Sequence, residues 1–267
     1  MSILIGSHVE ADDPVDGALA RGAQVAQVML GDPQKWTAPQ TAYPGGAAAL
    51  RQAAADAGIG LVVHAAYLIN VASTNNRVRI PSRQLLQKTL LAAAEIGAGA
   101  VVVHGGHVGP DDDPAAGVEN WFKVADALEC PVPLLIENTA GGAHAMARTL
   151  AAWRQLWQGI SAGAGAPQIG VCLDTCHAHA AGLSLATVVD DLRAITGRID
   201  LVHANDSRDA AGSGADRHAN LGQGQIDPGA IVQIVAQAGV TAIVETPGGP
   251  EAQAADIAWL RQRLGAI

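Results

Sequence analysis

The chain has 267 residues, a formal net charge of −9, and 49% hydrophobic but only 3% aromatic residues. This length suits one large α/β domain and is ample for a buried core, which aliphatic side chains must supply. An acidic balance by itself argues against a nucleic-acid partner. That argument weakens if some of the carboxylates bind cations, because bound cations would neutralise them.

The three cysteines, Cys130, Cys172 and Cys176, are odd in number. Disulfides are therefore not expected, and a reducing cytoplasm is the simpler setting. Cys172 and Cys176 could form a zinc pair, but the pattern around them is better explained by Asp174 and His177 as ligands. We expect no signal peptide and no membrane-spanning segment, because no apolar stretch reaches 18 residues.

Along the chain, short apolar runs alternate with Ala-rich helical stretches. Such alternation indicates right-handed parallel βαβ units, and eight strands are the number that closes a barrel. We therefore expect an α/β fold, a single (β/α)8 TIM barrel over residues 1–267. The expected strands lie at 3–8, 25–30, 60–64, 100–104, 132–137, 169–174, 199–203 and 241–245, and the helices at 46–57, 81–97, 116–129, 143–158, 184–196, 227–238 and 250–264.

Seven of these strands end in a residue that can bind a metal. In a barrel, the carboxyl ends of all the strands lie at one rim, which is where active sites are built. The repeated pattern therefore predicts a metal site at the carboxyl ends of the strands. The seven terminal residues are His8, His64, His104, Glu137, Asp174, His203 and Glu245.

Further candidate ligands follow the strands. His177 lies one turn beyond Asp174, whereas Asp216 and His218 share one side of an extended segment, since residues i and i+2 face alike. That segment belongs to the long 204–225 interruption, of a length that is usually functional. Mixed imidazole and carboxylate ligands favour zinc or manganese. We expect His8 to lie at the rim, and His107, His144 and His179 to be structural or to support ligands.

Nine ligands are more than one ion can use, so a cluster of two or three metals is expected. Two metals about 3.5–4 Å apart are the usual arrangement for in-line attack at phosphorus. Instead of binding a metal, each of these residues could form a hydrogen bond at the rim of the barrel or cap a helix. That alternative suits one or two positions but does not account for all of them together.

Several stretches resemble the endonuclease IV family of zinc-dependent apurinic/apyrimidinic (AP) endonucleases, which are DNA-repair enzymes on a TIM barrel. DTCHAHAAG and DRHANLGQG are the specific ones, because they combine ligands with fixed neighbours, and the likeness extends over essentially the whole chain. The stretches are GSHV at 6–9, HAAYLIN at 64–70, IENTAGG at 136–142, VCLDTCHAHAAG at 171–182, LVHANDS at 201–207, GADRHANLGQG at 214–224 and VET at 244–246.

The resemblance implies three zinc ions, with manganese as a possible substitute. His64 and His104 would hold the first, and Glu137 would bridge it to the second. Asp174, His203 and Glu245 would complete the second, and His177, Asp216 and His218 would hold the third. All nine positions carry the expected residue type.

The resemblance also implies the activity. A hydroxide between two zinc ions would attack the phosphate 5′ to an abasic site in double-stranded DNA, leaving a 3′-hydroxyl and a 5′-deoxyribose phosphate. Glu137 could orient this nucleophile, and no cofactor beyond the metals is expected. Neither a membrane nor an obligate protein partner is implied, and a monomer is expected.

DNA contacts are expected from loops at the same rim. Tyr67 and Leu68 match a family wedge that fills the gap left by a flipped abasic nucleotide. Gln34 stands where well-known members carry a wedge Arg, with Lys35 beside it, which puts the penetrating role of that loop in doubt. Arg217 could reach a phosphate. A basic stretch of the sequence contains Arg77, Arg79, Arg83 and Lys88. These side chains could contact the DNA backbone or form a solvated helix face.

Two other functions fit parts of the pattern. A sugar isomerase or epimerase of the xylose-isomerase-like barrels would need one divalent metal held by Glu, Asp, His and Glu at strand ends, a set that is present here. It would leave five ligand candidates unexplained. A catalytically silent DNA-binding or scaffold protein on the same barrel is disfavoured by the complete ligand set.

Overall fold

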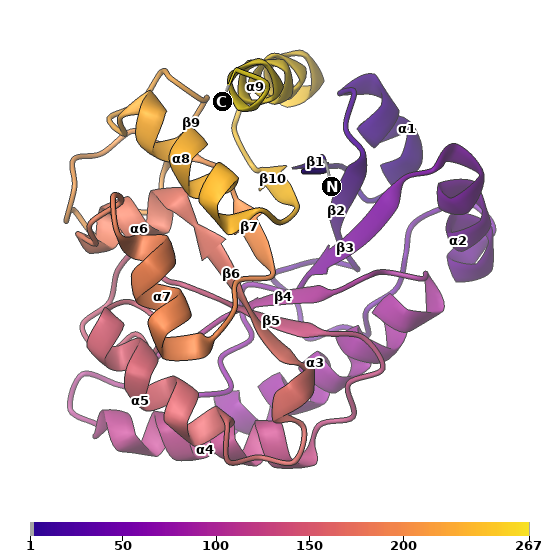
Figure 1. Cartoon of the computed structure of the whole chain (residues 1–267). Helices are drawn as coiled ribbons and strands as arrows, with labels where there is room; N and C mark the ends of the chain where they lie inside the picture. The colour runs from indigo at the N-terminus through magenta and orange to yellow at the C-terminus, as the bar shows by residue number, and fades with distance from the viewer. Residues whose placement is uncertain (1–2, 267) are drawn as a thin grey trace.

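Eight parallel strands close into a barrel in the computed structural model, which describes residues 3–266 (Figure 1). Around the barrel the strands follow the order β1-β10-β7-β6-β5-β4-β3-β2. All eight strands expected from the sequence are present, so the predicted TIM barrel is confirmed. They are β1 (Ile5–His8), β2 (Val25–Met29), β3 (Gly60–His64), β4 (Val101–His104), β5 (Leu134–Glu137), β6 (Ile169–Asp174), β7 (Leu201–His203) and β10 (Ala242–Val244).

The helices surround the barrel and cover its strands (Figure 1). Two short strands that are not part of the barrel, β8 (Asp206–Ser207) and β9 (His218–Ala219), form a separate antiparallel pair after β7. The helices are α1 (Pro14–Ala20), α2 (Gly46–Ala57), α3 (Asn76–Glu95), α4 (Pro114–Ala127), α5 (Leu150–Ile160), α6 (Thr175–Ala181), α7 (Val188–Thr196), α8 (Pro228–Ala238) and α9 (Gly249–Leu264).

The starts of α3, α5 and α7 differ clearly from the sequence prediction, and the short helices α1 and α6 were not predicted. Helix α7 begins at Val188 rather than at 184. Helix α3 begins at Asn76 rather than at 81, because the Asn75 side chain accepts a hydrogen bond from the Arg77 amide (2.9 Å) and caps the helix there. Helix α5 begins at Leu150 rather than at 143, where Thr149 caps it. The preceding residues pack instead against the loop after β4, where the Met146 amide donates to the Gly106 carbonyl (2.9 Å).

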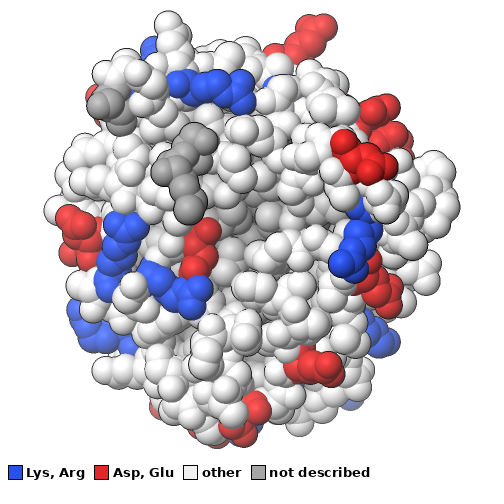
Figure 2. Space-filling view, turned by 45° about the vertical axis from the view of Figure 1, so that its right-hand side comes forward, with Lys and Arg blue, Asp and Glu red and all other residues white. Residues whose placement is uncertain are grey.

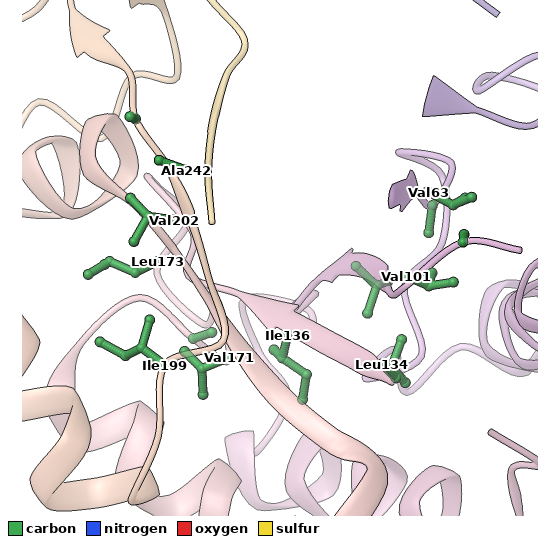
Figure 3. Packing of buried hydrophobic residues seen from close by; sticks show 14 of the residues in the cluster. Val63, Val101, Leu134, Ile136, Val171, Leu173, Ile199, Val202 and Ala242 are labelled. Carbon is green, nitrogen blue, oxygen red and sulfur yellow. The ribbon is translucent and has the colours of Figure 1, made fainter. Parts of the chain in front are cut away.

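Aliphatic side chains form two cores. The larger lies between the strands and the helices, and Figure 3 shows part of it, including Ile136, Val171 and Leu173. The smaller fills the barrel itself, because its members come from seven of the eight strands or their immediate starts and contact one another. They are Val25, Val62, Ala100, Val102, Leu135, Cys172, Leu201 and Ile243.

The surface carries few charged groups, as expected from a composition with 15% charged residues. On the face in Figure 2, basic and acidic side chains lie singly or near one another among uncharged residues, and no continuous basic area is visible. No helix within residues 3–266 is long and apolar enough to cross a membrane.

Candidate metal centre

The inner core of the barrel explains why the candidate ligands meet. Side chains at positions i and i+2 of a strand point to the same side. Val62 fills the barrel, so His64 two residues later also points inward, at the rim. The same spacing of two residues separates an inner-core side chain from a candidate ligand at the ends of five other strands. The pairs are Val102 and His104, Leu135 and Glu137, Cys172 and Asp174, Leu201 and His203, and Ile243 and Glu245.

Glu137 is the centre of the group and is fully buried. Its Oε2 lies 3.2 Å from His64 Nε2 and 3.3 Å from His104 Nε2. Its Oε1 lies 3.1 Å from both His177 Nδ1 and His203 Nδ1. Oε2 therefore faces His64 and His104 while Oε1 faces His203, which is the arrangement expected of a ligand that bridges two cations. His177 Nδ1 also lies 2.9 Å from the Asn138 carbonyl and so acts as a donor.

A second group forms around the ends of β6, β7 and β10. Glu137, Asp174, His203 and Glu245 each offer one ligand atom, and these atoms lie within 4.8 Å of one another. His203 Nδ1 is 3.3 Å from Glu245 Oε2. All four side chains could coordinate one ion placed between them.

The third group lies beyond the strand ends. His177 Nε2 is 3.0 Å and His218 Nε2 is 3.1 Å from the same oxygen, Asp216 Oδ1. Both nitrogens are buried, yet neither makes a hydrogen bond. Buried polar atoms without partners are rare, and two of them aimed at one carboxylate fit a cation between the three side chains.

Asp174 connects the second and third groups. Its Oδ2 is 3.9 Å from His218 Nε2, and its carboxylate belongs to a possible ligand group with His177 and His218 as well as to the second group. Asp174 also caps α6, because its Oδ1 accepts from the His177 amide (2.6 Å). The cap starts the helix at Thr175 and thereby places the His177 side chain over the centre.

Opposite charges stabilise these groups. Burial raises the pKa of Glu137, but the imidazoles of His203, His104 and His177 outweigh burial and hold its pKa well below the usual value. Burial lowers the pKa of His218, but Asp216 and Asp174 raise it to about 9. At Asp174, by contrast, burial outweighs the neighbouring imidazoles and raises the pKa, so this carboxylate needs further positive charge, which a bound cation can supply.

The ligand atoms surround a pocket of about 150 Å³ at the carboxyl end of the barrel. It is lined by ligand candidates from all three groups together with His8, Tyr67 and Gln253. The cysteines do not support a zinc pair, because no group of possible ligands within residues 3–266 contains both Cys172 and Cys176. Burial raises the pKa of each of these thiols to about 12.

Three supporting residues were missed by the sequence analysis. Gln27 of β2 contacts His203 and Glu245. Asn205 donates to Asp174 Oδ2 (2.6 Å), and Asn138 accepts from the Asp174 amide (2.7 Å). Gln27 had a usable signal, since it follows the inner-core residue Val25 by two positions, as the ligands follow theirs.

Of the residues expected to contact DNA, Tyr67 lies beside two candidate ligands, His64 and His104. Tyr67 is 58% exposed, and its ring centroid is 5.7 Å from that of His64, so it stands at the mouth of the pocket. Leu68 is half-buried against the core. Gln34 and Lys35 are exposed, and Lys35 Nζ is 2.7 Å from Asp32 Oδ2.

The basic residues are partly engaged within the protein. The exposed Arg217 pairs with Asp209, its Nε lying 2.9 Å from Asp209 Oδ2. On α3, Arg79 donates to the carbonyl of Ser73 and Arg83 to that of Asn120. The other two members of the basic stretch, Arg77 and Lys88, are exposed.

The remaining histidines make local contacts. His8 lies at the pocket wall, its Nδ1 3.2 Å from Gln27 Nε2, and burial lowers its pKa to about 4. His144 and His179 hydrogen-bond to carbonyls of Gly109 and Asp209. The amide of His107 donates to Asn70 Oδ1 (3.1 Å), which holds the loop after β4.

Comparison with known proteins places this geometry in a family. A family model described as a xylose isomerase-like TIM barrel matches residues 15–263. The probable endonuclease 4 of Mycobacterium tuberculosis (strain CDC 1551 / Oshkosh) is 55% identical over 263 residues, covering 98% of this chain and 100% of that protein. That of Mycobacterium leprae (strain Br4923) is 54% identical over 261 residues, covering 98% and 99%.

Solved structures agree with this placement. Endonuclease IV from Thermus thermophilus superposes with a TM-score of 0.83 at 29% identity, covering 99% of this chain and 100% of that one. A D-tagatose 3-epimerase-like protein superposes with a TM-score of 0.79 at 18% identity, covering 99% and 98%. At that identity, the second match shows a shared fold alone.

Proposed function

Because the chain belongs to the endonuclease IV family of the xylose isomerase-like TIM barrels, we propose that it is a DNA-repair hydrolase that cuts double-stranded DNA at abasic sites. The cut phosphodiester is the one 5′ to the abasic residue, and the products are a 3′-hydroxyl and a 5′-deoxyribose phosphate. The observation that carries this proposal is the convergence of nine candidate metal ligands at one end of the barrel, with Glu137 between them and seven of the nine lining one pocket.

We propose three zinc ions, with manganese as a possible substitute. His64, His104 and Glu137 hold the first, and Glu137 bridges to the second. The second is completed by Asp174, His203 and Glu245, and the third is held by His177, Asp216 and His218. Imidazole and carboxylate donors together suit zinc, and nine donors supply three sites of three or four ligands when one carboxylate is shared.

When bound, such ions lower the pKa of a water molecule to about 7 and stabilise charge on a phosphate. The side chains then have three tasks. Glu137, which stays ionised at the centre, would orient the attacking water. His177, Asp216 and His218 would hold the third ion, which would supply positive charge for the leaving oxygen. The buried walls around Glu137 exclude bulk water, which strengthens each of these electrostatic interactions.

DNA reaches this centre from the open rim of the barrel. Tyr67 stands exposed at the pocket mouth, where its ring can occupy the gap left by an abasic nucleotide that has turned out of the duplex. Flipping costs less for a nucleotide that has no base to unstack. Leu68 supports this loop from below through its core contacts, and Arg217, Gln34 and Lys35 are further candidates for DNA contact.

A single-metal sugar epimerase is the second candidate, because Glu137, Asp174, His203 and Glu245 form the four-residue set that it needs. It gives no role to the other five ligands, which lie around the same pocket. The high identity to the mycobacterial proteins named endonuclease 4 also favours the nuclease.

The test combines a metal count with a cleavage assay on the purified protein. The substrate is a duplex oligonucleotide with one tetrahydrofuran abasic analogue, which does not undergo β-elimination and so excludes lyase chemistry. We expect about three zinc ions per chain and one cut 5′ to the analogue, abolished by a strong chelator and absent from the undamaged duplex. One metal per chain with turnover of a ketose and no cutting would refute the proposal.

Two matched variants locate the activity. We expect His104→Ala to lower the cutting rate at least about 100-fold, because it removes a ligand beside the bridging carboxylate. His107 lies three residues after His104, in the loop that follows β4, and its exposed imidazole lies beside Asn70. The variant His107→Ala should therefore cut normally. Equal activity of the two variants would show that the ligand assignment is wrong.

A further inference from the structure

Gln27 is a polar residue in the middle of an apolar strand, and it is completely buried. A buried amide group without hydrogen-bond partners costs about 1–3 kcal/mol, so both ends of this side chain need partners. Three residues at the rim of the barrel provide them. Oε1 lies 2.8 Å from His203 Nε2, and Nε2 lies 2.6 Å from Glu245 Oε1 and 3.2 Å from His8 Nδ1.

The chemistry of these partners fixes the orientation of the amide. A carboxylate that serves as a metal ligand is deprotonated, and a deprotonated carboxylate only accepts hydrogen bonds. The Gln27 nitrogen must therefore face Glu245. The oxygen of Gln27 then faces His203, and an amide oxygen only accepts.

His203 Nε2 must therefore carry a hydrogen and donate it to Gln27. In a neutral imidazole only one nitrogen carries a hydrogen, so the lone pair of His203 is left on Nδ1. Nδ1 is the atom that lies 3.1 Å from Glu137 Oε1 and 3.3 Å from Glu245 Oε2. The lone pair thus points at the space between two carboxylates, where the second cation of the proposed function belongs.

Glu245 is fixed by the same amide. Because Gln27 occupies Oε1, the other oxygen, Oε2, is the one turned toward His203 Nδ1, where it also accepts from Asn205 Nδ2 (3.3 Å). The second hydrogen of the Gln27 nitrogen faces His8 Nδ1, which accepts it only when that imidazole nitrogen carries no hydrogen. One buried side chain therefore sets the facing atoms of two ligands and the tautomer of a neighbouring histidine.

We propose that Gln27 is a positioning residue, which presents His203 Nδ1 and Glu245 Oε2 to the second metal site. This inference rests on the proposed metal centre, but not on the substrate. Residues that hold metal ligands from behind typically contribute 10- to 100-fold to metal affinity or activity. Gln27 contacts His203, Glu245 and His8 and does not line the pocket, so its effect on the metal site must be exerted through these side chains.

Two substitutions separate the two ends of the amide. Gln27→Met has a similar size and removes both contacts. We expect it to lower zinc affinity, measured by chelator competition, by about 10- to 100-fold, and to lower kcat while KM for abasic DNA stays unchanged. Gln27→Glu keeps an acceptor for His203 and loses the donor to Glu245. Nitrogen NMR of zinc-loaded, histidine-labelled protein should show the His203 Nε2–H in the wild type and in Gln27→Glu, and its loss or displacement in Gln27→Met.

Asn120 provides the matched control. It is also a buried amide, but it donates to the carbonyls of Ala72 and Ser73 and does not line the metal pocket. Asn120→Leu should lower the urea midpoint yet leave zinc affinity and the His203 signal unchanged. Equal zinc affinity in Gln27→Met and the wild type, or equal losses in Gln27→Met and Asn120→Leu, would overturn the inference. A wild-type protein that binds zinc but leaves abasic DNA intact would refute the proposed function alone, since the zinc measurements on Gln27 still stand.

Discussion

Asp206 anchors the loop that carries two ligands of the third site, and replacing it with Asn should release that loop. Asp206 is fully buried and accepts four hydrogen bonds from backbone amides. Oδ1 accepts from Ser207 (2.7 Å) and Ile226 (3.0 Å). Oδ2 accepts from Gly222 (3.1 Å) and Gly224 (2.9 Å). Both ends of the segment between β8 and α8 are thus tied to one carboxylate.

The expected loss of loop stability follows from the number of hydrogen bonds lost. An amide has one oxygen, so Asp206→Asn keeps two of the four bonds and turns an NH₂ group toward two other N–H donors. Hydrogen bonds to a charged group contribute about 1.5–3 kcal/mol each, so the loss is about 3–6 kcal/mol. At about 1.4 kcal/mol per factor of ten, the loop should open roughly 10²- to 10⁴-fold more often. The packing around this carboxylate is tight, because a Cβ at Gly224 would collide with Asp206 and the Ser207 carbonyl.

The assay is hydrogen exchange followed at the amides of Gly222 and Gly224, together with a metal count after dialysis. We expect exchange at these amides to be roughly 10²- to 10⁴-fold faster. We also expect two zinc ions per chain instead of three, because Asp216 and His218 lie within the released segment. Asp227→Asn is the control. Asp227 caps α8 by accepting from the Ala230 amide, and Asn caps equally well, so neither quantity should change. If Asp206→Asn keeps three zinc ions and wild-type exchange, the loop is held by something other than this carboxylate.

Three further predictions concern the centre itself. Glu137→Gln should abolish incision and reduce bound zinc, because the bridging carboxylate loses its charge. Cutting rate and metal content are measured on the same sample, and wild-type values of both would contradict this prediction. Tyr67→Ala should weaken binding to abasic duplex in a filter or anisotropy assay while zinc content stays at the wild-type value, and a fall in zinc would show that Tyr67 is structural. The metal-free protein should lose stability as the pH rises. The pKa of His218 is raised from 6.5 to about 9, so the protonated imidazole stabilises the fold fully below pH 6.5 and no longer does so above about 9. Urea unfolding at several pH values should show this fall without zinc and not with it.

The sequence predicted the barrel and the residues that meet at its rim because both depend on local order along the chain. An apolar run that ends in His, Asp or Glu encodes the strand and the rim position at once, so His64, Glu137 and Asp174 could be found without knowing any contact. Their convergence then follows from closure of the barrel. The ligand assignment to individual ions goes further than this geometry and remains a prediction.

The parts that were missed depend on contacts between distant segments. Helix α5 starts at Leu150 because the residues before it pair with the loop after β4, and composition alone gives no sign of that pairing. Asn205 and Asn138 support Asp174 through hydrogen bonds that span more than 30 residues. Gln27 differs, because a polar residue within the apolar run 25–30 is visible in the sequence. A glutamine inside a strand does not belong to the pattern of charged and imidazole side chains at the strand ends.

The hydrogen bond from the His177 amide to Asp174 has a consequence for how this stretch of sequence can change. A residue that caps a helix binds an amide two or three positions ahead. Asp174 binds the amide three positions ahead, which belongs to the other candidate ligand, His177. An insertion or deletion between them would therefore remove the helix start and the ligand geometry in a single event. Only substitutions at Thr175 and Cys176 avoid this, and both side chains are completely buried. Relatives that keep the metal centre should accordingly vary in the length of many loops, but not in the spacing of these two residues.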